Sequence, residues 1–95
     1  MNTISLKKIH EFVEAHSESK SALTAWYKMA RKAKWRSLAD VRQVYPHADL
    51  VGRYTVFNIK GNDYRLIAEI NYQYQQILIR EILTHKEYDK DKWKR

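Results

Sequence analysis

The sequence predicts an α+β fold in which helices come first and an antiparallel sheet follows. Apolar residues before residue 46 recur at helical spacing, whereas after residue 53 they alternate with polar residues and include many β-branched and aromatic types. The length of 95 residues suits one domain. We therefore expect a single domain, residues 1–95, with N-terminal helices packed on a sheet of three or four strands and a short C-terminal helix.

Three helices are predicted in the first half of the chain. The first spans Ser5–Ala15 and is expected to be capped by Ser5. The second begins after Ser21 and buries Trp26 in the core, and the third begins at Ser37 and ends before Pro46. The inward-facing residues of the third helix are expected to be Leu38, Val41 and Val44.

Three strands are predicted in the second half, over Tyr54–Ile59, Tyr64–Ile70 and Gln76–Leu83, and Met1–Ile4 could add a short edge strand. Residues 60–63, with the sequence Lys-Gly-Asn-Asp, tolerate the positive φ angles that a hairpin turn requires. Alternation along the third strand places Ile77, Ile79 and Leu83 on one face and Leu78, Arg80 and Ile82 on the other.

The composition limits the classes of function. Eighteen Lys and Arg against eleven Asp and Glu give a net charge of +7, which favours a polyanionic partner, either nucleic acid or an acidic protein. No cysteine is present, which excludes disulfides and thiolate metal sites and suits a reducing cytoplasm. No run approaches the roughly 20 apolar residues of a membrane span, and the first residues lack the apolar core of a signal peptide. We expect a cytoplasmic protein with no membrane segment.

Three side chains near one end of the expected sheet suggest RNA cleavage without a metal. That reaction needs a base for the 2′-OH, a cation for the phosphorane and an acid for the leaving 5′-oxygen. Thr84 and Glu87 match a capping box, so His85 would begin a C-terminal helix, where it could act as acid or base. Arg65 could hold phosphate oxygens with its planar fork. Tyr88, one helical turn after His85, could donate a hydrogen bond, relay a proton or stack on a base.

Each of these three residues also has an ordinary structural interpretation. Arg65 could pair with Glu69 on the same strand. His85 could be an exposed residue at a helix start, and Tyr88 could pack the terminal helix on the sheet. No metal or other cofactor is expected, because the remaining histidines lack metal-ligand spacing.

Further basic and aromatic residues could bind RNA phosphates or bases. Five cations fall within nine residues without an acid, and they could bind RNA through counterion release or form a solvated helix face. Arg80 could line the same site or pair with Glu69 or Glu81, and Trp93 could stack on a base or anchor the chain end. The residues expected to bind RNA are Lys60, Arg80, Lys86, Trp93 and the cluster Lys28, Arg31, Lys32, Lys34 and Arg36.

Three blocks of the sequence together resemble the HigB toxins of bacterial toxin–antitoxin pairs. They are Phe57–Leu66, the dipeptide Ile79-Arg80 and Thr84–Asp89, and the resemblance extends more loosely to residues 37–41 and 45–46. It implies the RelE-like fold and an endoribonuclease that cleaves mRNA, usually on the translating ribosome. It also implies a cognate HigA-like helix-turn-helix antitoxin as partner. A noncatalytic RNA-binding module and a degenerate toxin that only binds its antitoxin are the alternatives.

Overall fold

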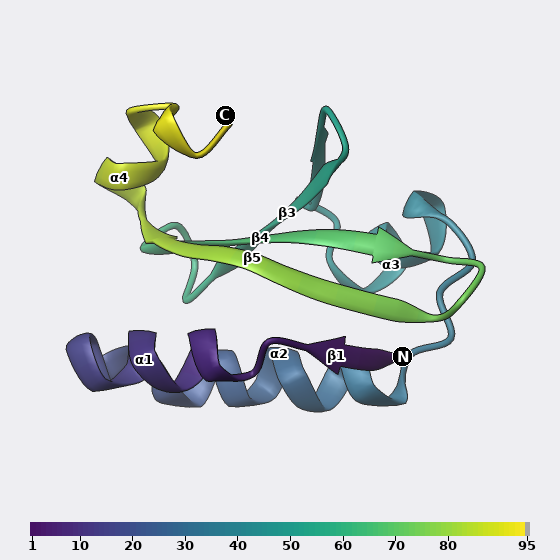
Figure 1. Ribbon diagram of the computed structural model, residues 1–95, viewed down its shortest axis with the longest axis horizontal. Coiled ribbons are helices and arrows are strands. Elements are labelled where there is room, and N and C mark those ends of the chain that lie inside the picture. Colours follow the sequence, from purple (N-terminus) through teal and green to yellow (C-terminus); the bar gives the residue numbers. More distant parts are fainter. Residues whose placement is uncertain (95) are drawn as a thin grey trace.

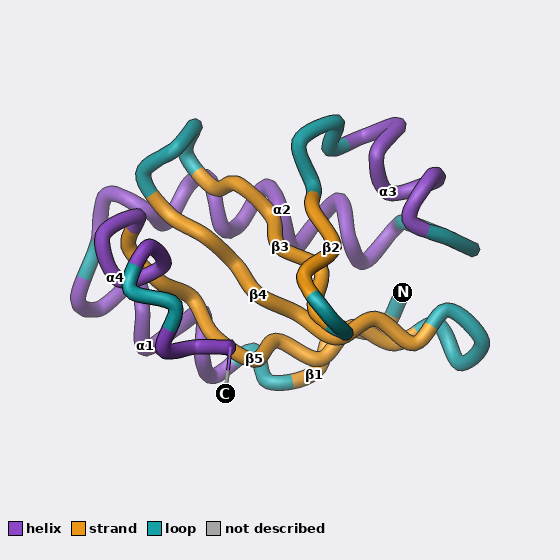
Figure 2. Tube along the Cα trace, turned by 90° about the horizontal axis from the view of Figure 1, so that it is seen from above, coloured by secondary structure: helices purple, strands orange, loops and turns teal. Residues whose placement is uncertain are grey.

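The computed structural model describes residues 1–94 as one five-stranded sheet with helices on both faces (Figure 1). Helices α1 and α2 lie under one face, and the short helix α4 lies over the other. Figure 2 shows the strands from above, in the order β1-β5-β4-β3-β2. The elements are β1 (Asn2–Ile4), α1 (Lys7–Ala15), α2 (Lys20–Lys32), α3 (Leu38–Val44), β2 (Asp49–Val51), β3 (Tyr54–Ile59), β4 (Tyr64–Asn71), β5 (Gln76–Thr84) and α4 (His85–Asp89), with 3-10 turns at Ser17–Ser19 and Lys92–Lys94.

The sheet is an antiparallel meander of β2 to β5, to which β1 adds in parallel beside β5. The predicted α+β class is confirmed, and the three predicted strands and the N-terminal edge strand all form. The predicted hairpin turn is confirmed too, since Lys60 and Gly61 have φ of 53° and 64°. The sequence did not predict β2, because three residues are too few for an alternating pattern to stand out.

The main core fills the space between α1, α2 and the sheet. Trp26 of α2 is 1% exposed and packs edge-on against Phe57 of β3, with ring centroids 5.4 Å apart. The prediction that Trp26 lies in the core is confirmed. Other side chains with at most 1% exposure in the core include Leu23, Val41, Leu66, Ile77 and Ile79.

Two predicted helix starts are wrong. Ser5 has a φ of 74° and does not cap α1, which begins at Lys7 after a turn at Leu6 that makes no side-chain cap hydrogen bond. Helix α2 begins at Lys20 rather than after Ser21, because the preceding 3-10 turn leads directly into it. Helical periodicity locates the apolar face of a helix better than it locates the first residue.

The predicted cap of α3 is confirmed, since the Ser37 side chain accepts a hydrogen bond from the Asp40 N–H at 3.4 Å. The inward position predicted for Val44 is wrong, because that residue is 42% exposed. Tyr45 packs on the main core instead, and its ring meets Phe57 edge-on with centroids 5.4 Å apart.

A β-bulge in β5 changes the face that its last residues occupy. Residues 67 and 68 of β4 pair with residues 81 and 79 of β5, so Arg80 has no partner in that ladder. The extra residue moves every later side chain to the opposite face. Ile82 therefore joins the main core, whereas Leu83 packs on the other side of the sheet. The predicted faces of Ile82 and Leu83 are wrong for this reason.

The face of the sheet away from α1 and α2, here called the open face, carries a second and smaller apolar cluster. Its buried members come from β3 and β4, and its partly buried members include side chains of α4 and the 3-10 turn after it. This cluster packs the C-terminal residues on the sheet. It consists of Tyr54, Val56 and Ile67, with Val51, Leu83, Tyr88 and Trp93 around them.

The packing of Phe57 predicts a large loss of stability when its ring is removed. Phe57→Ala should lower the free energy of unfolding by about 3–5 kcal/mol, because Phe57 is fully buried between three aromatic rings. Leu50→Ala is the control and should change it by no more than about 0.5 kcal/mol, since Leu50 is 54% exposed. Urea unfolding measures both variants. Equal losses in the two would contradict this core.

Candidate active site on the open face

Arg65 lies at the start of β4 with its guanidinium on the open face. The side chain is held by the hairpin turn that precedes it, because Nη1 donates to the carbonyl oxygens of Asn62 at 3.1 Å and Tyr64 at 3.2 Å. The other branch of the fork, Nη2, lies 3.2 Å from Nδ1 of His85. Only 9% of Arg65 is exposed, so the residue is a buried cation.

His85 begins α4, where the capping box predicted from Thr84 and Glu87 is confirmed. The backbone N–H of His85 donates to the Asp63 carbonyl at 3.0 Å, which ties α4 to the hairpin turn. A guanidinium has no acceptor atom, so Nδ1 of His85 must accept the bond from Arg65. The ring hydrogen of neutral His85 is then on Nε2, which lies 3.2 Å from a carboxylate oxygen of Asp89.

Tyr88 is the third predicted site residue, and its ring lies beside Arg65. The Cζ atom of Arg65 lies 5.4 Å from the centroid of the Tyr88 ring, within the range of a cation–π contact. Trp93 stacks on Tyr88, with centroids 5.0 Å apart, and its Nε1 donates to the Tyr88 carbonyl at 3.0 Å. Burial raises the pKa of the Tyr88 phenol, and the charge of Asp49 adds to the rise. The hydroxyl is therefore protonated at neutral pH and can donate a hydrogen bond.

The positive charge of Arg65 has no carboxylate partner within residues 1–94. The Arg65–Glu69 pair considered from the sequence is absent there, because Glu69 binds Arg53 at 3.0 Å and lies 3.9 Å from Arg80. The half-exposed His85 ring and the Tyr88 ring are its neighbours instead. The structure therefore brings the three predicted site residues together, with His85 and Tyr88 both next to the buried guanidinium of Arg65.

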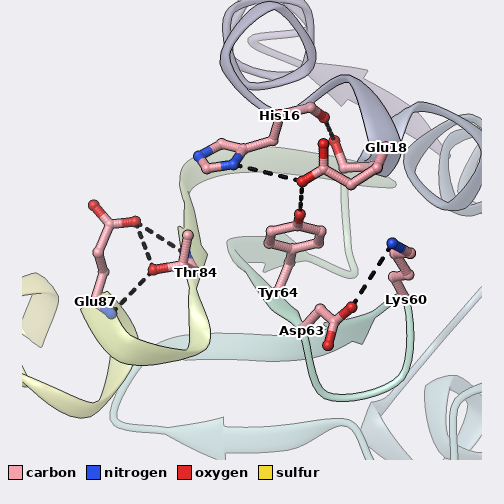
Figure 3. Close-up of polar contacts among 8 residues, drawn as sticks. His16, Glu18, Lys60, Asp63, Tyr64, Thr84 and Glu87 are labelled. Carbon is pink, nitrogen blue, oxygen red and sulfur yellow. Dashed lines mark hydrogen bonds and ion pairs between the residues drawn. The ribbon is translucent and has the colours of Figure 1, made fainter.

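A layer of polar contacts fixes the strand ends that precede Arg65 and His85 (Figure 3). Tyr64 and Thr84 are direct neighbours in the β4–β5 ladder. The Tyr64 hydroxyl donates to the Glu18 carboxylate, to which the His16 ring lies close at 3.8 Å. Glu87 accepts hydrogen bonds at 3.0 Å from both the backbone N–H and the hydroxyl of Thr84. These contacts hold Tyr64 and Thr84, the residues that directly precede Arg65 and His85 in the chain.

The basic cluster predicted to bind RNA lies far from this group of residues. Lys28, Arg31 and Lys32 are on α2, under the face of the sheet opposite to α4 (Figure 1). Arg36 is partly neutralised, because it forms an ion pair with Asp40 at 3.2 Å. A hollow of about 690 Å³ is bordered by four of the five cations, namely Arg31, Lys32, Lys34 and Arg36.

The other predicted RNA-binding residues lie nearer to Arg65. Lys60 is in the hairpin turn and forms an ion pair with Asp63 at 3.8 Å. Arg80 is exposed at the bulge of β5, and Lys86 is exposed on α4. Trp93 lies on the open face against Tyr88.

Sequence reasoning assigned no role to two neighbours of the site. Asp89 contacts Nε2 of His85, and the spacing of four residues on a helix was the signal for that contact. Tyr54 meets Trp93 edge-on, with centroids 6.0 Å apart. That contact joins β3 to the chain end, and no local pattern in the sequence indicates it.

The described part of the chain has neither a cluster of metal-binding side chains nor a helix that could cross a membrane. In residues 1–94, no three His, Asp or Glu side chains gather closely enough to hold a metal ion. None of the helices in this part of the chain has the length and apolar run needed to cross a membrane.

The α+β fold is compatible with that of a known class of protein, the RelE-like toxic component of a toxin–antitoxin system. The family model with that description, HigB toxin, matches residues 19–91, and the chain belongs to this family. The resemblance noted in the sequence is thereby confirmed.

Individual relatives match over most of their length. The chain is 30% identical over 92 residues to the mRNA interferase toxin HigB of Escherichia coli strain K12, an alignment that covers 94% of this chain and 88% of that protein. The mRNA interferase HigB of Shigella flexneri gives the same values. The mRNA interferase HigB of Escherichia coli O6:H1 strain CFT073 is 26% identical over 93 residues, with coverage of 95% and 90%.

The Tyr64–Glu18 hydrogen bond predicts a late titration of one phenol. The bond to Glu18 is the largest cause of a rise in the pKa of Tyr64 to about 12, so the fold favours the neutral phenol. The resulting stabilisation is complete below the unfolded pKa of about 10 and is lost as the pH rises from there to about 12. Carbon NMR of labelled tyrosines measures the titration.

Glu18→Gln is the matched variant for this titration. It should move the pKa of Tyr64 back toward 10, because the carboxylate charge is lost while the side-chain size is kept. A wild-type Tyr64 that titrates together with the exposed tyrosines would contradict the proposed bond.

Proposed function

We propose that this chain is an endoribonuclease toxin that cleaves mRNA, with Arg65, His85 and Tyr88 as its catalytic residues. The observation that carries the proposal is the buried Arg65 guanidinium, which touches His85 and Tyr88 and has no carboxylate partner in residues 1–94. A guanidinium fork without a carboxylate partner suits a phosphate group. Membership of the HigB toxin family, whose matched relatives are named mRNA interferases, supports the same activity.

The reaction needs no group beyond those in the chain and its RNA. The 2′-oxygen of a ribose attacks the adjacent phosphorus, a 2′,3′-cyclic phosphate forms, and the bond to the 5′-oxygen of the next nucleotide breaks. When a phosphate arrives, the Arg65 fork turns to its oxygens and stabilises the charge of the phosphorane. This movement frees Nδ1 of His85, which then accepts the proton of the 2′-OH, while Asp89 stabilises the resulting imidazolium.

Tyr88 is the donor to the leaving 5′-oxygen in this scheme. Its raised pKa keeps the phenol protonated, and its ring lies under the guanidinium that would hold the phosphate. The phenol can give this proton to the alkoxide that develops as the bond breaks, because an alkoxide is a stronger base than a phenolate.

The partners that we propose are mRNA, the translating ribosome and a HigA-like helix-turn-helix antitoxin in the cytoplasm. The net charge of +7 favours each polyanion. The part of the basic cluster on α2 is exposed on the face opposite to Arg65, where it could bind ribosomal RNA phosphates while the open face takes the message. Lys60 lies in the hairpin turn before Arg65 and Lys86 follows His85 on α4, and both could position the message phosphates.

Loss of His85 tests the proposed cleavage. His85→Ala should lower the rate of message cleavage in a reconstituted translation reaction by about 10²-fold to 10⁴-fold, the usual effect of a lost acid–base group. His10→Ala is the control and should cleave normally, because His10 is exposed on α1. Primer extension maps the cuts. A folded wild-type chain that makes no cuts would favour a noncatalytic RNA-binding module, and unchanged cleavage by His85→Ala would refute its role.

The basic cluster predicts a salt-dependent contribution to ribosome binding. Changing Lys32 and Lys34 together to Gln should reduce the slope of log K against log salt by about 1.4, if each lysine neutralises one phosphate. The control is the double change of Lys7 and Lys20, which are exposed outside the cluster, and it should leave the slope nearly unchanged. Sedimentation with ribosomes at several salt concentrations measures it. The same slope in both double variants would remove the cluster from the interface.

A further inference from the structure

A groove crosses the open face of the sheet beside the Arg65 site. It has a volume of about 280 Å³ and combines two kinds of lining. One kind is aromatic and apolar, from β3, β4, β5 and the turn after α4. The other is polar and charged, from the bulge of β5 and from Ser5 and Lys8 at the start of α1. The residues that line the groove include Tyr54, Trp93, Ile67, Leu78, Arg80 and Glu81.

The groove lies next to the proposed catalytic residues. Ile67 follows Arg65 by two residues on the same face of β4, a separation of about 7 Å along a strand. Trp93 borders the groove and stacks on Tyr88, which in turn lies under the Arg65 guanidinium. A ligand with its phosphate at Arg65 could therefore place a neighbouring group in the groove without leaving the sheet surface.

The lining suits a small flat ligand with a polar edge. Tyr54 and Ile67 are 8% and 1% exposed and give an apolar surface, and the ring of Trp93 is partly exposed beside them. The volume lies at the lower limit of about 300–1,000 Å³ for small-molecule pockets, enough for one planar ring system.

The charged part of the groove has capacity for new hydrogen bonds. Glu81 is exposed and forms no ion pair with another residue of the described chain. Arg80 has a single distant carboxylate, Glu69, at 3.9 Å. The bulge presents these two side chains next to each other in the sequence, so a cationic fork and a carboxylate border the same cavity.

We propose that this groove binds an unpaired base of the RNA next to the phosphate held by Arg65. The base stacks on Trp93, and its edge meets Arg80 and Glu81, which can distinguish acceptors such as guanine O6 and N7 from amino groups. Lys94, now 5.8 Å from the centroid of Trp93, is exposed and can move aside. This inference rests on the proposed function, because its ligand is RNA. It adds the place on the protein where the identity of an RNA base is recognised.

Binding of RNA that cannot be cut tests the groove separately from catalysis. The probes are fluorescein-labelled 2′-O-methyl hexanucleotides, each made of one of the four bases, and fluorescence anisotropy at fixed salt gives their affinities. Trp93→Ala should weaken binding by about 5-fold to 150-fold, the usual loss of one stacked base. Trp93→Phe keeps an aromatic ring and should stay within a few-fold of the wild type.

Two further variants examine the reading of the base edge. Arg80→Gln and Glu81→Gln alter exposed side chains, so both should fold, and each should change the order of affinity among the four probes. Tyr74→Ala is the control, because Tyr74 is 66% exposed and does not line the groove, and it should bind all four probes as the wild type does.

The outcomes separate this inference from the proposed function. Equal affinity in Trp93→Ala and the wild type, or an equal loss in Trp93→Phe and Trp93→Ala, would overturn the stacking site. An unchanged order of affinity in both charge variants would overturn the reading of the base. A chain that binds the probes as expected and cuts no message would overturn the nuclease and leave the groove intact.

Discussion

The site depends on one constraint, the burial of a guanidinium without an opposite charge. Arg65 is 9% exposed, and its contacts are two backbone carbonyls, a histidine nitrogen and an aromatic ring. These neutral groups accept hydrogen bonds from part of its N–H donors and leave its charge uncompensated within residues 1–94. Burying a charge is costly unless it is paired. An arriving phosphate would supply the missing negative charge.

The arrangement of β4 and β5 explains how residues far apart in the sequence converge on that cation. The ladder pairs Tyr64 with Thr84, so the next residue on β4 and the first residue of α4 meet at the same end of the sheet. The capping box begins α4 at this point, and the stack of Trp93 on Tyr88 packs it on the open face. The bulge at Arg80 then places both Arg80 and Glu81 along the neighbouring groove.

Local patterns in the sequence predicted most of the fold and named the residues of the site. The hairpin turn, the three long strands and the capping box at Thr84 each rest on residues close in sequence, and all of them form. The bulge and the Tyr54–Trp93 contact depend on pairing between separate segments, which no local pattern contains, and β2 is too short for an alternating pattern to stand out. The blocks containing Arg65 and His85 suggested a common site, but only the folded sheet gives their contact.

The most direct test of the Arg65 site is induced expression in growing bacteria, with transcript cuts mapped by primer extension. The wild type and Arg53→Ala should arrest growth and produce new cuts inside translated messages, since Arg53 is an exposed arginine already paired with Glu69. Arg65→Ala should do neither, although it accumulates as a folded protein. Cuts of equal frequency in Arg65→Ala would contradict the claim that this buried cation holds the phosphate.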